Sequence, residues 1–214
     1  MKKNLTELVF ILDRSGSMGG LERDTIGGFN SMLEKQKREP GDAYVSTVLF
    51  DNHREVLHDR LSLQDVPPMT DREYYVRGST ALLDAVGEAI KHIGNIHKYA
   101  REEDRPERTL FVITTDGMEN ASQRYRYEQV KDMIQRQQKQ YGWEFLFLGA
   151  NIDAAKEAAR FGIHADHAAD YHADPQGTAV IYEAVNEAVC QARARRPMTA
   201  AWKKKVDADY KNRK

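Results

Sequence analysis

The sequence has little cysteine, no long apolar run and no excess of charge of either sign. A single cysteine, Cys190, excludes an intrachain disulfide and a cysteine-rich zinc site. No stretch approaches the ~18 consecutive apolar residues of a membrane span. The balance of 32 basic against 33 acidic residues argues against a nucleic-acid binder with a dominating positive field. The remaining composition, 41% hydrophobic and 30% charged, is typical of a globular protein.

The 214 residues fit one domain with a short extension, since a domain averages roughly 150 residues. Residues 1–3, Met-Lys-Lys, resemble the start of a signal peptide. The apolar run that follows, residues 8–12, is too short for a signal sequence, ends in Asp13 and precedes no small-residue cleavage site. We therefore expect a cytoplasmic protein.

Apolar runs predict the strands of a sheet. The run at 5–12 is continuously β-branched and aromatic, which is typical of a strand buried on both faces. A second strand at 43–50 is expected to pair with a short strand at 54–58 across a hairpin turn, Asp51-Asn52-His53. Further strands are expected at 110–114 and 143–148, and the signal at 165–171 is weak. The polar stretch 61–76 predicts a loop.

Segments with apolar residues three and four apart predict the helices. They cover residues 21–39, a helix that opens at 78–80, a helix from about 126, and residues 153–160 and 176–194. Strands separated by such helices predict parallel crossovers, so we expect an α/β fold with a mainly parallel sheet and helices on both faces.

Hydroxyls and carboxylates follow the predicted strands. Asp13, Ser15 and Ser17 come after the first strand, Asp116 after the strand at 110–114, and Thr80 lies in the loop before a helix. Ligands of open α/β sheets bind beyond the carboxyl ends of the strands. Because such oxygens are hard donors, the set suits Mg²⁺, Mn²⁺ or Ca²⁺ better than zinc. The two carboxylates would balance the charge of a dication. If few carboxylates bind the ion directly, the ion stays electrophilic and can accept a carboxylate from another molecule.

These residues resemble a known family. Residues 13–17, Asp-Arg-Ser-Gly-Ser, fit the D-x-S-x-S motif of the von Willebrand factor A (VWA) domain. Thr80 resembles the threonine of the family's second loop, and Asp116 resembles the aspartate of its third loop. Together they resemble a complete metal-ion-dependent adhesion site (MIDAS). The resemblance covers roughly residues 5–190 and is closest to small stand-alone bacterial and phage VWA proteins.

The resemblance implies a fold and roles for the residues. The fold would be Rossmann-like, with one antiparallel edge strand from 54–58 and the strands ending in Asp13 and Asp116 side by side. Ser15 and Ser17 would bind the ion directly, Thr80 directly or through water, and the two aspartates mostly through waters or hydrogen bonds. The ion would then take an Asp or Glu of a protein partner. Relatives of this size commonly serve intracellular assemblies, often with AAA+ ATPases.

Other functions are weighed against this one. Ser and Asp after a strand also cap helices, and a scaffold or regulatory subunit with a purely structural metal is the main alternative. A haloacid-dehalogenase-like phosphatase would need a second aspartate two residues after Asp13, where Ser15 cannot supply a carboxyl proton. Neither a G-x-S-x-G elbow nor a phosphate-binding glycine loop is present. We therefore expect a binding protein without catalytic residues.

Two further clusters invite a functional interpretation. Residues 124–127 alternate Arg and Tyr, for which helix packing is a better explanation than a charged rim. A second cluster mixes imidazoles and carboxylates that suit Zn²⁺, Ni²⁺ or Fe²⁺, but its spacing matches no motif, so we expect solvated surface. It comprises His164, Asp166, His167, Asp170, His172 and Asp174.

The chain divides into a domain over 1–194 and a basic tail over 195–214. Residues 191–214 hold nine basic and two acidic side chains, and the rest holds 23 basic and 31 acidic. Basic residues interleave with Trp202 and Tyr210, a pattern that can bind RNA, anionic lipid or an acidic partner. The interpretation we favour is a helical extension that docks Trp202 on the domain.

Overall fold

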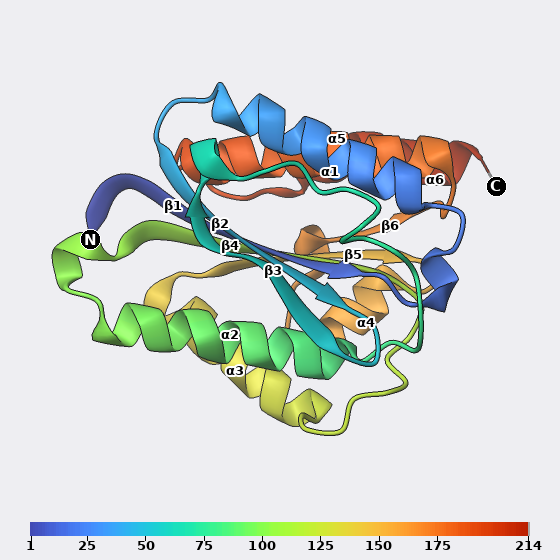
Figure 1. The fold of residues 1–214 in the computed structure, drawn as a ribbon, viewed down its shortest axis with the longest axis horizontal. Coiled ribbons are helices and arrows are strands. Elements are labelled where there is room, and N and C mark those ends of the chain that lie inside the picture. The colour runs from blue at the N-terminus through green and yellow to red at the C-terminus, as the bar shows by residue number, and fades with distance from the viewer. Residues whose placement is uncertain (214) are drawn as a thin grey trace.

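A computed structural model, which describes residues 1–213, contains a six-stranded sheet between two layers of helices (Figure 1). The strand order is β3-β2-β1-β4-β5-β6, and β3 runs antiparallel to β2 while the other neighbours are parallel. This confirms the predicted α/β fold with one antiparallel edge strand. The strands are β1 (Lys2–Asp13), β2 (Asp42–Phe50), β3 (Arg54–Ser62), β4 (Pro106–Asp116), β5 (Glu144–Ala150) and β6 (Ala168–Tyr171).

The helices divide between the two faces of the sheet. One face carries α1 (Glu22–Lys37), α5 (Pro175–Arg193) and α6 (Lys204–Asn212), at the top of Figure 1. The other face carries α2 (Leu82–Tyr99), α3 (Tyr127–Tyr141) and α4 (Ala154–Arg160). Each layer buries its own apolar cluster against the sheet.

The continuous apolar run of β1 follows from this sandwich. Leu8, Phe10 and Leu12 point into the cluster under α1 and α5, and Val9 and Ile11 point into the cluster under α2. Successive side chains of a strand alternate between faces, and both faces are covered here, so every position must be apolar.

The structure differs from several of the predicted elements. Strand β3 continues to Ser62 rather than ending at 58. Helix α2 begins at Leu82, after the predicted opening at 78–80, because Gly78 has a φ of 66° and lies in a loop. The weak signal at 165–171 resolves into a single 3-10 turn, Ala165–His167, followed by the short strand β6.

The residues after 195 pack on the domain. Trp202 is only 1% exposed, and its indole Nε1 donates a hydrogen bond to the carbonyl of Asp166 at 3.0 Å. Val206, four positions later, is buried in the same apolar cluster. The structure thus confirms the favoured interpretation, a helical extension that docks Trp202 on the domain. In residues 1–213 no helix has the length and apolar character needed to cross a membrane.

One buried histidine makes stability depend on pH. His58 of β3 is 3% exposed and its Nδ1 lies 3.0 Å from the Thr47 hydroxyl. Burial lowers the pKa of His58 below its ordinary value, so the folded state keeps it neutral where the unfolded chain binds a proton. Its contribution to stability is therefore complete above about pH 6.5 and is lost as the pH falls from there through the folded pKa.

We expect the free energy of unfolding to fall less between pH 7.5 and 5.5 in His58→Gln than in the wild type. Urea unfolding at the two pH values measures this difference. His53→Gln, in the exposed hairpin turn, is the matched control and should behave like the wild type. Equal losses in His58→Gln and the wild type would contradict the prediction.

Candidate metal centre

The predicted site lies where the direction of the chain across the sheet reverses. Strands β1 and β4 are neighbours, with Leu12 paired to Thr114, so Asp13 and Asp116 end adjacent strands. From β1 the chain crosses to β2, and from β4 it crosses to β5 on the other side. Such a reversal leaves a crevice at the carboxyl ends of the strands.

Asp13 joins the loop that follows β1, here called the first loop, to the loop that follows β4, here called the third loop. Its Oδ1 accepts a hydrogen bond from the backbone N–H of Ser15 at 2.7 Å. Its Oδ2 accepts from the hydroxyl of Thr115 at 2.7 Å and from the backbone N–H of Asp116 at 3.2 Å. One buried carboxylate thus fixes both loops relative to each other.

Three hydroxyls converge beside Asp13. The Oγ atoms of Ser15 and Ser17 are 3.1 Å apart, and Thr80 Oγ1 donates to Ser15 Oγ at 3.1 Å. The hydroxyl of Ser17 also donates to the backbone carbonyl of Asp116. The structure therefore gathers all five predicted residues, Asp116 joining through its carbonyl.

The cluster is buried except at one side. Asp13, Ser15, Thr80 and Asp116 are at most 4% exposed, whereas Ser17 is open to solvent. Burial raises the pKa of Asp13, although hydrogen bonds from Ser15, Thr115 and Asp116 oppose the shift. Burial likewise raises the pKa of Asp116, opposed by its hydrogen bond from Asn151. A nearby dication would favour both ionised forms.

The residues fit a hard cation. The converging donors are oxygens throughout, which is the set that Mg²⁺, Mn²⁺ and Ca²⁺ prefer. Within the described part of the chain, no group of three or more His, Cys, Asp or Glu side chains could hold a metal ion. A site at this edge of the sheet must therefore depend on the hydroxyls.

The histidine and aspartate cluster at 164–174 has structural contacts instead. Asp170 accepts from the backbone N–H of Ala154 at 2.7 Å, and Asp174 caps α5 through Gly177 at 2.7 Å. The ring of His172 stacks on Tyr210 at 4.7 Å. These contacts give Asp170, His172 and Asp174 structural roles.

The alternating segment 124–127 also packs as expected. Tyr125 and Tyr127 lie against the apolar cluster under α2. Arg124 forms an ion pair with Glu88 of α2. The favoured interpretation, helix packing, accounts for both.

Several supporting residues lie outside the predicted set. Asn151, directly after β5, donates from Nδ2 to Asp116 Oδ1 at 2.5 Å. Asn120 accepts from the backbone N–H of Thr80 at 2.9 Å, and the Tyr74 hydroxyl donates to the Asp13 carbonyl at 2.5 Å. Asn151 could have been found as the polar residue that follows a third parallel strand. Tyr74 lies in a segment predicted only as loop, and nothing local marks it.

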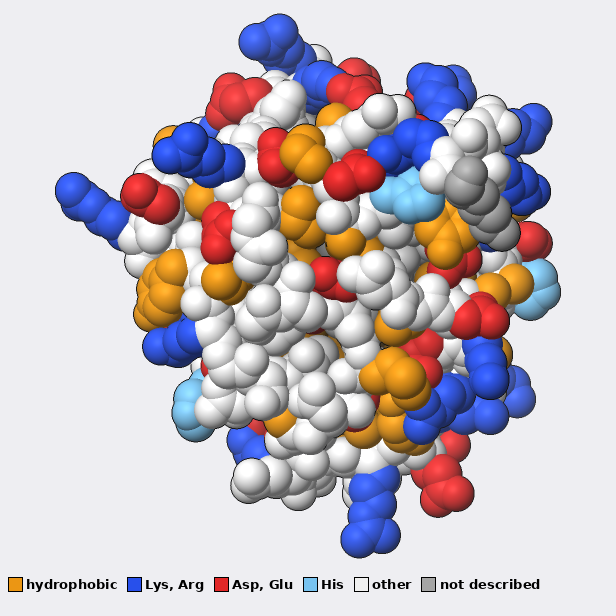
Figure 2. Space-filling view, turned by 90° about the vertical axis from the view of Figure 1, so that its right-hand side faces the viewer, with side chains coloured by type: hydrophobic (Ala, Val, Ile, Leu, Met, Phe, Trp, Pro, Cys, Tyr) orange, Lys and Arg blue, Asp and Glu red, His pale blue; other side chains and the backbone are white. Residues whose placement is uncertain are grey.

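The surface around the site carries little charge. Figure 2 looks onto the carboxyl ends of the strands and shows charged side chains mainly at the periphery, with uncharged side chains and backbone over much of the centre. Gly19, Gly20 and Ser79 are exposed there, and Met118, two residues after Asp116, is 58% exposed.

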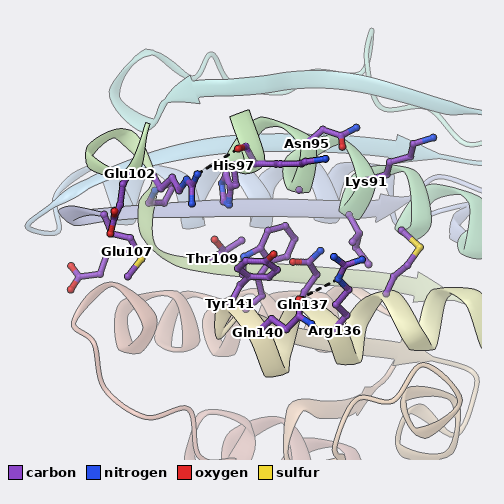
Figure 3. Close-up of a pocket in the computed structure, with 18 residues that line it drawn as sticks. Lys91, Asn95, His97, Glu102, Glu107, Thr109, Arg136, Gln137, Gln140 and Tyr141 are labelled. Carbon is purple, nitrogen blue, oxygen red and sulfur yellow. Dashed lines mark hydrogen bonds between the residues drawn. The ribbon is translucent and has the colours of Figure 1, made fainter. Parts of the chain in front are cut away.

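A separate groove of about 630 Å³ lies between α2 and α3 (Figure 3). Thr109 and Trp143 contribute to its lining, and Lys91, His97 and Arg136 reach it from the two helices. It lies near the amino end of β4, whereas Asp116 is at the carboxyl end. The groove is therefore distinct from the predicted metal centre.

No family model and no curated protein matches the sequence. Among solved structures, proximal thread matrix protein 1 from the mussel byssus is similar at 14% identity and a TM-score of 0.58, over 87% of this chain and 46% of that one. Another structure of that protein is described as having a zinc-occupied MIDAS motif, with 12% identity and a TM-score of 0.56 over 86% of this chain and 46% of that one.

Two bacterial structures are similar as well. A von Willebrand factor type A protein from Catenulispora acidiphila has 16% identity and a TM-score of 0.57, over 88% of this chain and 42% of that one. The vWF domain of the type V pili tip protein Mfa5 from Porphyromonas gingivalis has 12% identity and a TM-score of 0.60, over 86% and 94%. This chain spans less than half the length of the mussel and Catenulispora proteins. From the strand order and these similarities, the chain has the fold of a von Willebrand factor A domain.

Proposed function

We propose that this chain is a divalent-cation-dependent protein-interaction module. The observation that carries the proposal is the convergence of the Ser15, Ser17 and Thr80 hydroxyls beside Asp13 at the reversal point of the sheet. These residues and Asp116 would hold the ion, with Mg²⁺ as the first choice and Mn²⁺ or Ca²⁺ as alternatives. When bound, the ion would offer a coordination position to a carboxylate of a protein partner.

The protein's own residues prepare this contact. Asp13 is committed to Ser15, Thr115 and Asp116, so it fixes the loops while the hydroxyls bind. Neutral hydroxyl ligands leave more of the ion's charge for the partner. The mussel protein with a zinc-occupied MIDAS motif supports metal binding by a domain of this fold.

The partner would present an Asp or Glu to the metal. Since the surrounding surface is largely uncharged (Figure 2), further affinity would come from shape and from apolar contact with exposed residues such as Met118. By family analogy we propose an assembly in the cytoplasm, such as one with an AAA+ ATPase. Ser15 stands where a phosphatase of this topology needs an acid, which favours binding over catalysis. A phosphatase screen with Mg²⁺ and a generic ester tests that choice.

Divalent cations are expected to raise the melting temperature. A ligand that binds only the folded state at 100 times its Kd stabilises it by about 2.7 kcal/mol, which corresponds to roughly 5–10 °C for a chain of this size. Calorimetry with Mg²⁺, Mn²⁺ or Ca²⁺, each compared with EDTA, measures the shift. Ser17→Ala should lose most of it, and Ser31→Ala, at an exposed position on α1, should keep it. A wild type that gains no stability from any of the three cations would refute the metal centre.

The main alternative is a purely structural metal. In that case EDTA should disrupt the fold and any complex together. If the metal bridges to a partner, EDTA at 25 °C should dissociate the complex while the circular dichroism of the chain stays native. Affinity capture with the wild type, in Mg²⁺ and in EDTA, separates the two functions.

A further inference from the structure

Arg14, the variable residue within D-x-S-x-S, is buried in an ion-pair network. Its Nε lies 3.0 Å from Asp51 Oδ2, and both side chains are fully buried. Its Nη2 lies 2.8 Å from Glu55 Oε2, and its Nη1 donates to the carbonyl of Glu73 at 3.2 Å. A fully buried charge is costly unless it is paired, so Arg14 depends on Asp51.

Asp51, the residue after β2, also holds the segment that leads to Thr80. Its Oδ2 accepts a second charged hydrogen bond, from Arg77 Nε at 2.8 Å. Its backbone carbonyl accepts from the N–H of Ala81 at 2.8 Å. Its Oδ1 accepts from the N–H of His53 at 2.8 Å, which fixes the hairpin turn. Thr80 thus lies between two residues that are fastened to Asp51.

The same segment is joined to the first loop through the backbone. Arg77 donates its N–H to the carbonyl of Arg14 at 2.9 Å, and Gly16 donates to the carbonyl of Gly78 at 3.1 Å. Gly78 has a φ of 66°, and a Cβ there would lie 2.1 Å from Asn52 Oδ1. The loop therefore passes the hairpin turn at close contact.

We propose that Asp51, acting through Arg14 and Arg77, is a positioning residue of the metal centre. It holds the Thr80 hydroxyl within hydrogen-bonding distance of the Ser15 hydroxyl before a cation binds. Thr80 comes from a segment without helix or strand, whose ordering would otherwise cost conformational entropy at the moment of binding. This inference rests on the proposed metal-dependent function, and its failure can be separated from the failure of that function.

The first experiment compares Mn²⁺ affinities by titration calorimetry. Asp51→Asn keeps the shape of the side chain and removes its charge, and we expect affinity to fall about 10- to 100-fold, as for other residues that orient metal ligands. Asp59→Asn is the matched control, because Asp59 is exposed on neighbouring β3 and pairs with His92. Its affinity should equal that of the wild type.

A double-mutant cycle distinguishes positioning from a general structural role. Thr80→Val removes the hydroxyl and keeps the buried shape. If Asp51 acts through Thr80, Asp51→Asn should weaken Mn²⁺ binding much less in the Thr80→Val background than in the wild type. An equal loss in both backgrounds would overturn the proposal.

A second variant covers the case that Asp51→Asn fails to fold. Arg77 is 45% exposed, so Arg77→Gln loosens the same link while Asp51 keeps its pair with Arg14. It should lower Mn²⁺ affinity several-fold with a native circular dichroism spectrum, and unchanged affinity would refute the positioning role. A wild type that binds none of Mg²⁺, Mn²⁺ and Ca²⁺ would refute the proposed function itself, and this inference with it.

Discussion

Replacing Asp13 by alanine is expected to remove divalent-cation binding while the chain stays folded. Asp13 accepts three hydrogen bonds, from Ser15, Thr115 and Asp116, and these join the first and third loops. Without the carboxylate, the serine hydroxyls lose their fixed position and the site loses one of its two negative charges. We expect the affinity for Mg²⁺ or Mn²⁺ to fall by about 100-fold.

The stability of Asp13→Ala should change modestly. The change removes the acceptor of three donors, those of Ser15, Thr115 and Asp116, and each donor that finds no other partner costs about 1–3 kcal/mol. It also removes a carboxylate whose burial raises its pKa, and this offsets part of the cost in the absence of metal. Calorimetric titration and urea unfolding measure the two effects. Asp132→Ala, at an exposed position on α3, should bind like the wild type, and unchanged metal affinity in Asp13→Ala would sink the assignment.

The largest loss of stability is expected from Trp202→Ala. The indole is 1% exposed within the cluster under α1 and α5 and donates to the carbonyl of Asp166. Removing a large buried aromatic side chain costs about 3–5 kcal/mol, because the cavity collapses only partly. Urea unfolding should show this loss. Tyr99→Ala, at a position 79% exposed, should change stability by less than about 0.5 kcal/mol.

That result would bear on the meaning of the basic segment. If Trp202→Ala unfolds like the wild type, the residues after 195 are a detachable tail. Binding of RNA or anionic lipid by that tail would then become the better interpretation. A large loss would instead mean that the segment completes the domain. Both results follow from the same unfolding curve.

Several basic residues of the C-terminal segment are neutralised by acidic residues of the domain. Basic residues near the C-terminus pair with acidic residues of the domain, as Arg195 does with Glu107 at 2.7 Å and Lys205 with Glu187 at 2.9 Å. Arg213 pairs with Asp174 at 2.6 Å. Lys203 Nζ donates to the carbonyls of Ala165 and Ala168 at 2.8 and 2.6 Å. Part of the positive charge of the C-terminal segment is therefore used in contacts with the domain rather than exposed to a partner.

Local patterns predicted the parts of the site that follow strands. Asp13 and Asp116 are marked because each ends a continuous apolar run, and the strand order then places them side by side. Asn151 follows β5 in the same way, but its neighbours form no motif that marks it. Gly78 indicated a break in the chain before Thr80, but it did not indicate where α2 begins. The start of α2 depends on hydrogen bonds that residues 77–81 make with residues distant in sequence.

The sequence by itself determined the α/β class, the antiparallel edge and the three loops that carry hydroxyls and carboxylates. These follow from hydrophobic period and strand ends, which are properties of neighbouring residues. Only the tertiary structure decided that Arg14 and Asp51 are buried partners and that Tyr74 supports Asp13. The physical reason is that pairing and burial depend on which distant segments meet, and a single charged or aromatic residue in a loop carries no local signal of its partner.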